Sequence, residues 1–243
     1  MPNQTEYKFK IDTDNEILLS VPQGGGVFIP TGTTSLLFKA VCSYIRKPGK
    51  VLDLGCGSGV VGIALHKKGL ASVPLYASDV SEHTVDYVKT NSLRHHCPVI
   101  VKCGSLFTPW ENEKFDYIVN DVSGIAEEIA TLSPWYDKVS CTSGVDGTLL
   151  TVEVIQNASK YMNTGGLFFF PVISLSNVEK ILTEANKNFS HVEKLFHKEW
   201  PLPEMLCKHR AMLDNVQREG HIEIVEKFGM VLYFTDIYVA YNT

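Results

Sequence analysis

Three glycines at alternate positions follow a short apolar run, and they form the stretch of the sequence best suited to hold a ligand. Val51–Leu54 precedes Gly55, Gly57 and Gly59, and apolar residues return at helical spacing from Val61. Glycine adopts positive φ angles and lets a ligand approach the backbone closely. The pattern predicts a buried strand, a sharp turn and a helix whose free N–H groups face a bound ligand.

The class of ligand depends on the spacing of the glycines and on the acid before them. A dinucleotide-binding turn has glycines at its first, third and sixth positions, but the sixth residue from Gly55 is Val60. Asp53 suits a pyrophosphate poorly and suits an ammonium group well. The turn therefore favours a ligand that carries an amine, while a nucleotide site and a purely structural turn stay open as alternatives.

Further polar residues follow the next two predicted strands. Asp79 ends the strand after the glycine turn, where a carboxylate can bind both hydroxyls of a ribose; its alternative role is to cap a turn. Ser105 follows the third strand and is expected to hydrogen-bond the edge of an adenine, with Leu106 or Phe107 covering the ring. An ordinary turn is the alternative there.

The fourth predicted strand, Phe115–Asn120, ends in two residues that suit an acceptor site. Asn120 has a donor and an acceptor and can orient an amine or an amide. Asp121 can accept a proton or balance a developing positive charge. Alternatively, Asp121 caps a segment that begins near Ile125.

The Asp-x-Gly-x-Gly-x-Gly arrangement resembles the first motif of the class I S-adenosylmethionine (SAM)-dependent methyltransferases. From about residue 27 to 173 the chain also resembles the small-domain methyltransferases that include the release-factor glutamine N5-methyltransferases. The matching positions are Ile29, Pro30, Thr34, Asp79, Ser81, Phe115, Asp116, Ile118, Asn120, Gly144, Asp146 and Gly147. This resemblance implies a methyltransferase that binds SAM and needs no metal.

The resemblance and the strand-end positions together predict the site. The residues expected to bind SAM are Thr34, Asp53, Gly55, Cys56, Gly57, Ser58, Gly59, Asp79, Val80, Ser105, Leu106 and Asn120. Within this set, Asp53 is expected to hold the amino group and Asp79 the ribose. Asn120 and Asp121 are expected to be catalytic and to position the acceptor for attack on the methyl group.

The chain departs from that family at the acceptor loop. The family follows its Asn with Pro-Pro-Tyr, whereas this chain has Asp121, Val122 and Ser123; the Arg usual after Ile-Pro is Thr31, and only about 30 residues precede the core. We therefore expect a different acceptor, a small molecule or an N or O nucleophile presented by Asn120–Ser123. A glutamine-type protein N-methyltransferase and a catalytically inactive SAM-binding scaffold are the alternatives.

Strands that alternate with helices predict an α/β fold, a doubly wound, seven-stranded, mostly parallel, Rossmann-like sheet. Residues 1–32 are expected to form a hairpin and a loop, and 33–243 the methyltransferase domain. A helix is expected over 146–162, closed by Gly165 and Gly166. A further helix is expected within 201–228, inserted before the last strand as a candidate lid over the substrate. His209 in this insertion could act as a base, although a surface or packing role is favoured.

Composition limits the compartment and the partners. The chain has 243 residues with 44% hydrophobic residues, 20% charged residues and a net charge of -5, which suits one folded domain and disfavours nucleic acid as a partner. It has no apolar run of membrane-spanning length, no signal-peptide pattern and no paired cysteine spacing. We expect a cytoplasmic protein without a membrane partner; the oligomeric state is not predicted.

Overall fold

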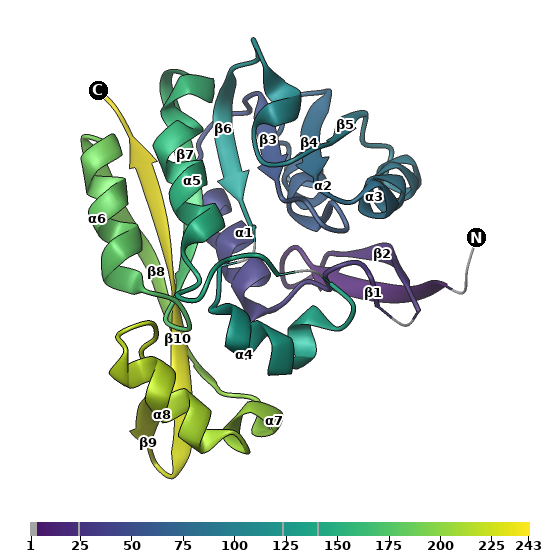
Figure 1. The fold of residues 1–243 in the computed structure, drawn as a ribbon. Helices are drawn as coiled ribbons and strands as arrows, with labels where there is room; N and C mark the ends of the chain where they lie inside the picture. Colours follow the sequence, from purple (N-terminus) through teal and green to yellow (C-terminus); the bar gives the residue numbers. More distant parts are fainter. Residues whose placement is uncertain (1–3, 24, 123, 140) are drawn as a thin grey trace.

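The computed structural model describes residues 4–23, 25–122, 124–139 and 141–243, and it consists of a twisted sheet, a separate hairpin and flanking helices (Figure 1). The strands are β1 (Gln4–Lys10), β2 (Glu16–Pro22), β3 (Val51–Leu54), β4 (Leu75–Asp79), β5 (Val99–Cys103), β6 (Phe115–Asn120), β7 (Met162–Ile173), β8 (His191–Pro201), β9 (Val225–Lys227) and β10 (Met230–Tyr241). The α-helices are α1 (Gly32–Tyr44), α2 (Val60–Lys67), α3 (Glu82–Arg94), α4 (Glu127–Leu132), α5 (Leu149–Ala158), α6 (Val178–Asn188), α7 (Glu204–Cys207) and α8 (Arg210–Arg218).

The main sheet has the order β5-β4-β3-β6-β7-β10-β8. Its pairs from β5 to β7 are parallel, and β10 runs antiparallel between β7 and β8. The predicted α/β fold with a mostly parallel sheet is confirmed. The predicted count of seven strands is wrong by one, because the three-residue strand β9 pairs with β10 and makes the sheet eight-stranded.

Helices cover both faces of the sheet (Figure 1). On one face, α1 and α2 pack with the hairpin against Val51, Val119 and Phe169. On the other face, α5 and α6 pack against Leu52 and Ile118 together with neighbouring strand residues. Strands buried on both faces read as continuous apolar runs, which is why the central strands show no polar alternation in the sequence.

Two predicted helices differ from the observed ones. The helix expected over 146–162 is shorter, α5, and it is followed by a turn of 3-10 helix over Ser159–Tyr161. Gly165 and Gly166 lie inside β7 rather than at the end of a helix. The insertion predicted as one helix contains α7 and α8, separated at Lys208 and His209.

A buried amide is one of the contacts that join the hairpin β1–β2 to the main domain. Asn91 of α3 accepts a hydrogen bond from the Ser20 N–H (2.7 Å) and donates to the Ser20 carbonyl (3.1 Å). Its Nδ2 also donates to the carbonyl of Ser58 in the glycine turn (2.9 Å). This side chain therefore ties β2, α3 and the glycine turn together.

Candidate functional site

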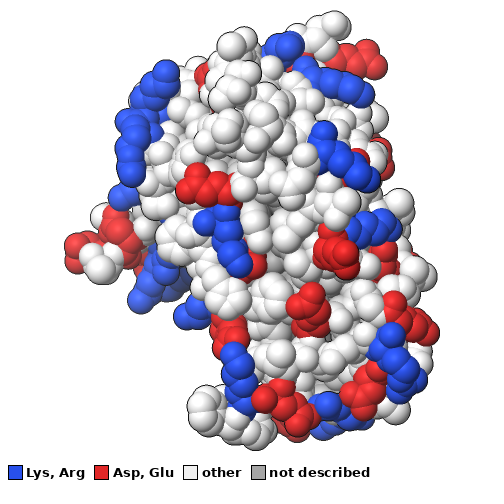
Figure 2. Space-filling model, turned by 90° about the vertical axis from the view of Figure 1, so that its left-hand side faces the viewer, with Lys and Arg blue, Asp and Glu red and all other residues white. Residues whose placement is uncertain are grey.

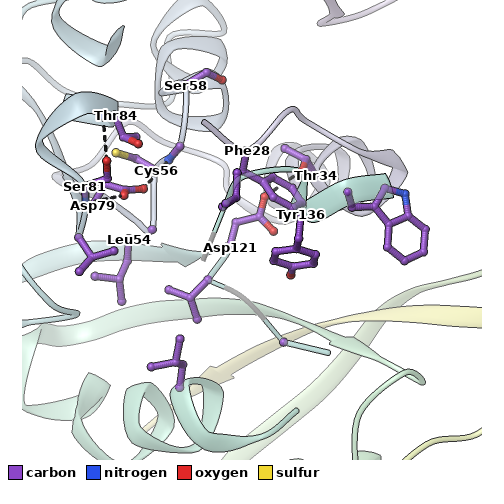
Figure 3. A pocket seen from close by; sticks show the side chains of 18 of the residues that line it. Phe28, Thr34, Leu54, Cys56, Ser58, Asp79, Ser81, Thr84, Asp121 and Tyr136 are labelled. Atoms are coloured by element: carbon purple, nitrogen blue, oxygen red, sulfur yellow. Dashed lines mark hydrogen bonds between the residues drawn. The ribbon is translucent and has the colours of Figure 1, made fainter. Parts of the chain in front are cut away.

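A cavity of about 570 Å3 opens at the carboxyl ends of β3, β4 and β6 (Figure 3). Its lining comes from the glycine turn, the loop ahead of α1, the segment after β6 and the stretch around residues 135–142. In open α/β sheets this edge is where ligands bind, because the carboxyl ends of neighbouring strands diverge there. Its size lies within the range of small-molecule and cofactor pockets.

The predicted glycine turn forms one wall of the cavity. Gly55 and Gly57 have φ angles of 70° and 50°, which an L-residue adopts only at a cost. The N–H groups of Gly55 and Cys56 both donate to the carbonyl of Ser78 at 3.0 Å, which joins the turn to β4. A Cβ on Gly55 would lie 2.7 Å from the Val122 Cγ1, so only glycine lets the turn and the loop after β6 approach this closely.

Asp79 lies beside this turn and lines the cavity. Its Oδ2 accepts a hydrogen bond from the Gly57 N–H at 3.0 Å, and its Oδ1 accepts one from the Ser81 N–H at 3.1 Å. Burial raises the pKa of this carboxyl, and the backbone N–H groups act in the opposite direction. The end of β4 thus presents a fixed carboxylate to the cavity, as the sequence predicts.

Asp53 is placed differently from the prediction. The side chain is 1% exposed and is absent from the cavity wall. Its Oδ2 accepts a hydrogen bond from the Gly62 N–H in α2 at 2.8 Å, and its Oδ1 is buried without a partner among the described residues. Asp53 therefore supports α2 beneath the turn, and the structure does not bring it to the position expected for the amino group of a ligand.

Burial raises the pKa of Asp53 to about 8, and Asp121 and Asp79 add to this rise. The folded chain therefore keeps a proton that the unfolded chain loses near pH 4, so the free energy of unfolding falls as pH rises towards 8. We expect Asp53→Asn to reduce this fall, because an amide does not ionise in this pH range, while its oxygen can still accept from the Gly62 N–H. Urea unfolding of the variant and the wild type at pH 6 and pH 8 tests this; equal falls for both proteins would contradict it.

Two more predicted ligand contacts are not on the cavity wall. Asn120 is 1% exposed and is not a lining residue. Side chains alternate along a strand, so Asn120 lies on the same side of β6 as Ile118, which packs towards α5. Gly59 is the N-cap of α2, and a Cβ there would lie 3.1 Å from Val88. The Asn120 Oδ1 is buried without a hydrogen-bond partner among the described residues. The predicted loop residue Ser123 lies outside the described residues.

The remaining predicted cofactor residues do line the cavity, namely Thr34, Cys56, Ser58, Val80, Ser105 and Leu106. Phe107, the alternative to Leu106, instead stacks on Tyr161 in the core, with ring centroids 4.4 Å apart. The Ser58 hydroxyl is buried and has no hydrogen-bond partner among the described residues. Such a hydroxyl on the cavity wall is available to a bound ligand.

Asp121 also lines the cavity, as predicted for an acceptor residue. It follows Val119 on the side of β6 that faces α1, and the Thr34 hydroxyl donates to its Oδ2 at 2.9 Å (Figure 3). Its backbone N–H donates to the Leu54 carbonyl at 3.1 Å. Burial raises the pKa of Asp121 to about 6, and the Thr34 hydrogen bond opposes this rise.

Aromatic rings beside Asp121 form a part of the cavity that the sequence prediction missed. Phe28 and Tyr136 lie with ring centroids 5.3 Å apart, and Trp135 and Tyr233 lie 5.5 Å apart; all four line the cavity. The adjacent pair of aromatic residues after Pro134 is the one sequence signal for this wall, and it has neither helical nor strand periodicity. Lys138 is the single lysine or arginine among the lining residues that the structure describes.

Other candidates lie elsewhere. His209 is exposed at the start of α8 and is not a lining residue, which matches its favoured surface role. In the described part of the chain, no group of three His, Cys, Asp or Glu side chains is arranged to hold a metal ion. None of the described helices has the length and apolar character needed to cross a membrane.

The chain is similar to known methyltransferases in sequence and in fold. Residues 26–121 match the family described as methyltransferase small domain. The chain is 28% identical over 179 residues to the ribosomal protein L11 methyltransferase of Staphylococcus saprophyticus subsp. saprophyticus, which covers 70% of this chain and 53% of that protein. It is 32% identical over 124 residues to the L11 methyltransferase of Staphylococcus epidermidis, covering 49% of this chain and 38% of that protein. The chain thus spans about half or less of these relatives.

Solved structures show the same fold. The 16S rRNA N2 G1207 methyltransferase of T. thermophilus, solved with AdoMet and guanosine, has a TM-score of 0.63 and 15% identity, covering 99% of this chain and 51% of that one. The ribosomal protein L11 methylase of Lactobacillus delbrueckii subsp. bulgaricus has a TM-score of 0.53 and 17% identity, covering 87% and 79%. The predicted resemblance to class I, small-domain methyltransferases is confirmed.

Proposed function

We propose that this chain, which has the fold and the small domain of the class I SAM-dependent methyltransferases, transfers the methyl group of SAM to an amine nitrogen. The observation that carries the proposal is the position of Asp121. Its carboxylate shares one cavity with the glycine turn and Asp79 on one side and with the aromatic rings on the other.

The cavity fits SAM in shape and in charge. The glycine turn allows close approach of a ligand, and the Asp79 carboxylate suits the ribose hydroxyls. The sulfonium of SAM is a cation. Among the described residues that line the cavity, two are carboxylates, Asp79 and Asp121, and one is a lysine. When bound, SAM supplies a methyl group that is already activated. The protein then has to align the acceptor and exclude water.

The part of the cavity around Asp121 and the neighbouring aromatic rings suits an amine as the methyl acceptor. A carboxylate beside aromatic rings attracts an ammonium group through charge and cation–π contacts. Burial among the rings lowers the pKa of that amine. In the proposed reaction the nitrogen loses a proton to the Asp121 carboxylate. Its lone pair forms the new N–C bond while the bond between sulfur and the methyl carbon breaks, and the bonding pair returns to sulfur.

The charge of the chain supports an amine over a phosphate-rich acceptor. The face that carries α6 and α8 shows lysines and arginines interspersed with aspartates and glutamates (Figure 2). The net charge of the chain is -5. Binding to a nucleic-acid backbone favours a continuous basic surface. The curated relatives are named for methylation of a ribosomal protein, which supports a protein-borne amine, and a small-molecule amine is the second source to test.

The test of this function is methyl transfer from isotopically labelled SAM. One reaction contains size-fractionated cell protein and a second contains the small-molecule fraction, each with wild-type protein. Acid hydrolysis of the labelled products separates methylated amines from N5-methylglutamine, which releases methylamine. A labelled methylated amine other than free methylamine, found in either fraction, supports the proposal and identifies the source. Label in RNA, in a glutamine amide or in no product would contradict it.

Asp79→Ala is expected to weaken SAM binding by about tenfold to a hundredfold, because hydrogen bonds to a charged group contribute about 1.5–3 kcal/mol. Isothermal titration calorimetry with SAM measures the affinity directly. Asp86→Ala is the matched control, since Asp86 is an exposed carboxylate on α3 whose ion pair is with Lys89. An unchanged affinity in Asp79→Ala would refute the ribose role.

A further inference from the structure

The hydroxyl of Thr34 joins the start of α1 to the acceptor site. Thr34 is 2% exposed and occupies the third position of α1. Its Oγ1 accepts a hydrogen bond from the Thr31 N–H at 3.3 Å and lies 2.9 Å from the Asp121 Oδ2. A backbone N–H can only donate, and a hydroxyl has one proton. The Thr34 proton is therefore directed to Asp121.

We propose that Thr34 is a positioning residue that fixes the Asp121 carboxylate in its charged, proton-accepting form. This inference rests on the proposed function, in which Asp121 receives the proton of the acceptor. Thr34 donates to Oδ2, and the Leu54 carbonyl holds the Asp121 backbone N–H. Among the described residues no hydrogen bond reaches Oδ1, which leaves this oxygen for the acceptor.

The start of α1 is itself held rigidly, so the hydroxyl has little freedom to move. The Trp200 indole donates to the Thr235 Oγ1 at 3.2 Å, and that oxygen lies 3.1 Å from the Thr33 hydroxyl. A Cβ on Gly32 would lie 2.6 Å from the Trp200 ring. These contacts from β8 and β10 fix the first turn of α1, and with it the direction of the Thr34 O–H bond.

Asp121 also has charged neighbours from other elements. Asp53 in β3 and Asp79 at the end of β4 are acids, so their charged forms oppose a second negative charge. Tyr136 and Tyr233 line the same cavity, and Lys138 lines its wall after the 3-10 turn Pro134–Tyr136. Among the described residues, the Thr34 hydroxyl is the one side chain that donates a hydrogen bond to Asp121.

The test compares Thr34→Val with Thr34→Ser in the full chain. Valine keeps the shape and removes the hydroxyl, whereas serine keeps the hydroxyl. Titration of 13C-labelled aspartate carboxyls by NMR, with Asp121→Asn for assignment, reports the pKa of Asp121 without any substrate. We expect Thr34→Val to raise this pKa by about one to two pH units, because a hydrogen bond to a charged group is lost. Thr34→Ser should restore the wild-type value.

The same variants are then assayed for methyl transfer. We expect Thr34→Val to lower kcat about twofold to tenfold at pH 7, because less of Asp121 is ionised, and to shift the rise of activity to higher pH. The pH shift should persist at saturating SAM, and thermal unfolding shows that the variant is folded. An unchanged Asp121 pKa in Thr34→Val, or lost SAM affinity with an unshifted pH profile, would overturn the inference. Absence of methyl transfer by the wild type would instead refute the proposed function, because the NMR titration does not depend on turnover.

Discussion

Asp121→Asn is expected to lower kcat by about a hundredfold to ten-thousandfold, the usual contribution of a positioned acid–base group. The amide keeps the size of the side chain and can still accept from Thr34, but it cannot take up a proton. Because the pKa of Asp121 is about 6, wild-type activity should rise as pH increases through 6, where the carboxyl ionises. The variant should lack this rise. A pH profile of kcat with labelled SAM measures both effects.

The control for this change is the affinity for SAM, which should stay within about threefold if Asp121 acts on the acceptor rather than on the cofactor. Asp86→Asn, which alters an exposed carboxylate on α3, should leave kcat unchanged. If Asp121→Asn kept more than about a third of the activity, proton transfer to this residue would be excluded as a significant part of the barrier.

Gly55→Ala should destabilise the chain by about 2–5 kcal/mol, because a left-handed backbone costs about 1–2 kcal/mol and an overpacked contact costs about 1–3 kcal/mol. Gly55 has a φ angle of 70°, and its added Cβ would lie 2.7 Å from Cγ1 and 3.1 Å from Cα of Val122. Relief of this contact must move the turn or the loop after β6. SAM affinity should therefore fall more than tenfold. Urea unfolding and calorimetry measure the two effects.

Gly69→Ala separates the two causes. Gly69 has a φ angle of 69°, nearly that of Gly55, but a Cβ there would meet no atom within 4 Å. This variant should pay only the left-handed conformational cost of about 1–2 kcal/mol and should bind SAM normally. Equal losses of stability in the two variants would mean that the contact with Val122 has no effect.

Local signals in the sequence predict the cofactor side of the site well. Positive φ angles need glycine, so the turn at Gly55 and Gly57 is visible in the residue types themselves. Ser81 is the N-cap of α3 as a polar residue before a helix should be, and this places Asp79 just ahead of it. Such features depend on neighbours within a few residues, which one sequence records directly.

The direction of a side chain at a strand end was harder to predict. Asn120 and Asp121 are adjacent, yet alternation along β6 sends Asn120 towards α5 and Asp121 towards α1. Only the helices packed on each face decide which direction leads to the cavity. The direction of the Asp53 side chain was equally hard to predict, because its carboxylate turns to the Gly62 N–H.

The N-cap of α1 is Thr31, whereas capping propensity alone suits any threonine in that segment.

The aromatic wall was missed because it is assembled from distant parts of the chain. Phe28 lies ahead of α1, Tyr136 lies in a short 3-10 turn after α4, and Tyr233 lies in β10. No spacing within the sequence connects these positions. Periodicity detects residues that share one helix or one strand, and here the four rings come from three separate parts of the chain.

The amide of Asn91 has a mechanical consequence for the molecule. This single side chain hydrogen-bonds both to the backbone of Ser20 and to the carbonyl of Ser58. The glycine turn is therefore held more rigidly by the hairpin β1–β2, although no described residue of β1 or β2 lines the cavity. Detachment of the hairpin would also free the glycine turn, so residues far from the cavity help to keep the cavity wall in one conformation.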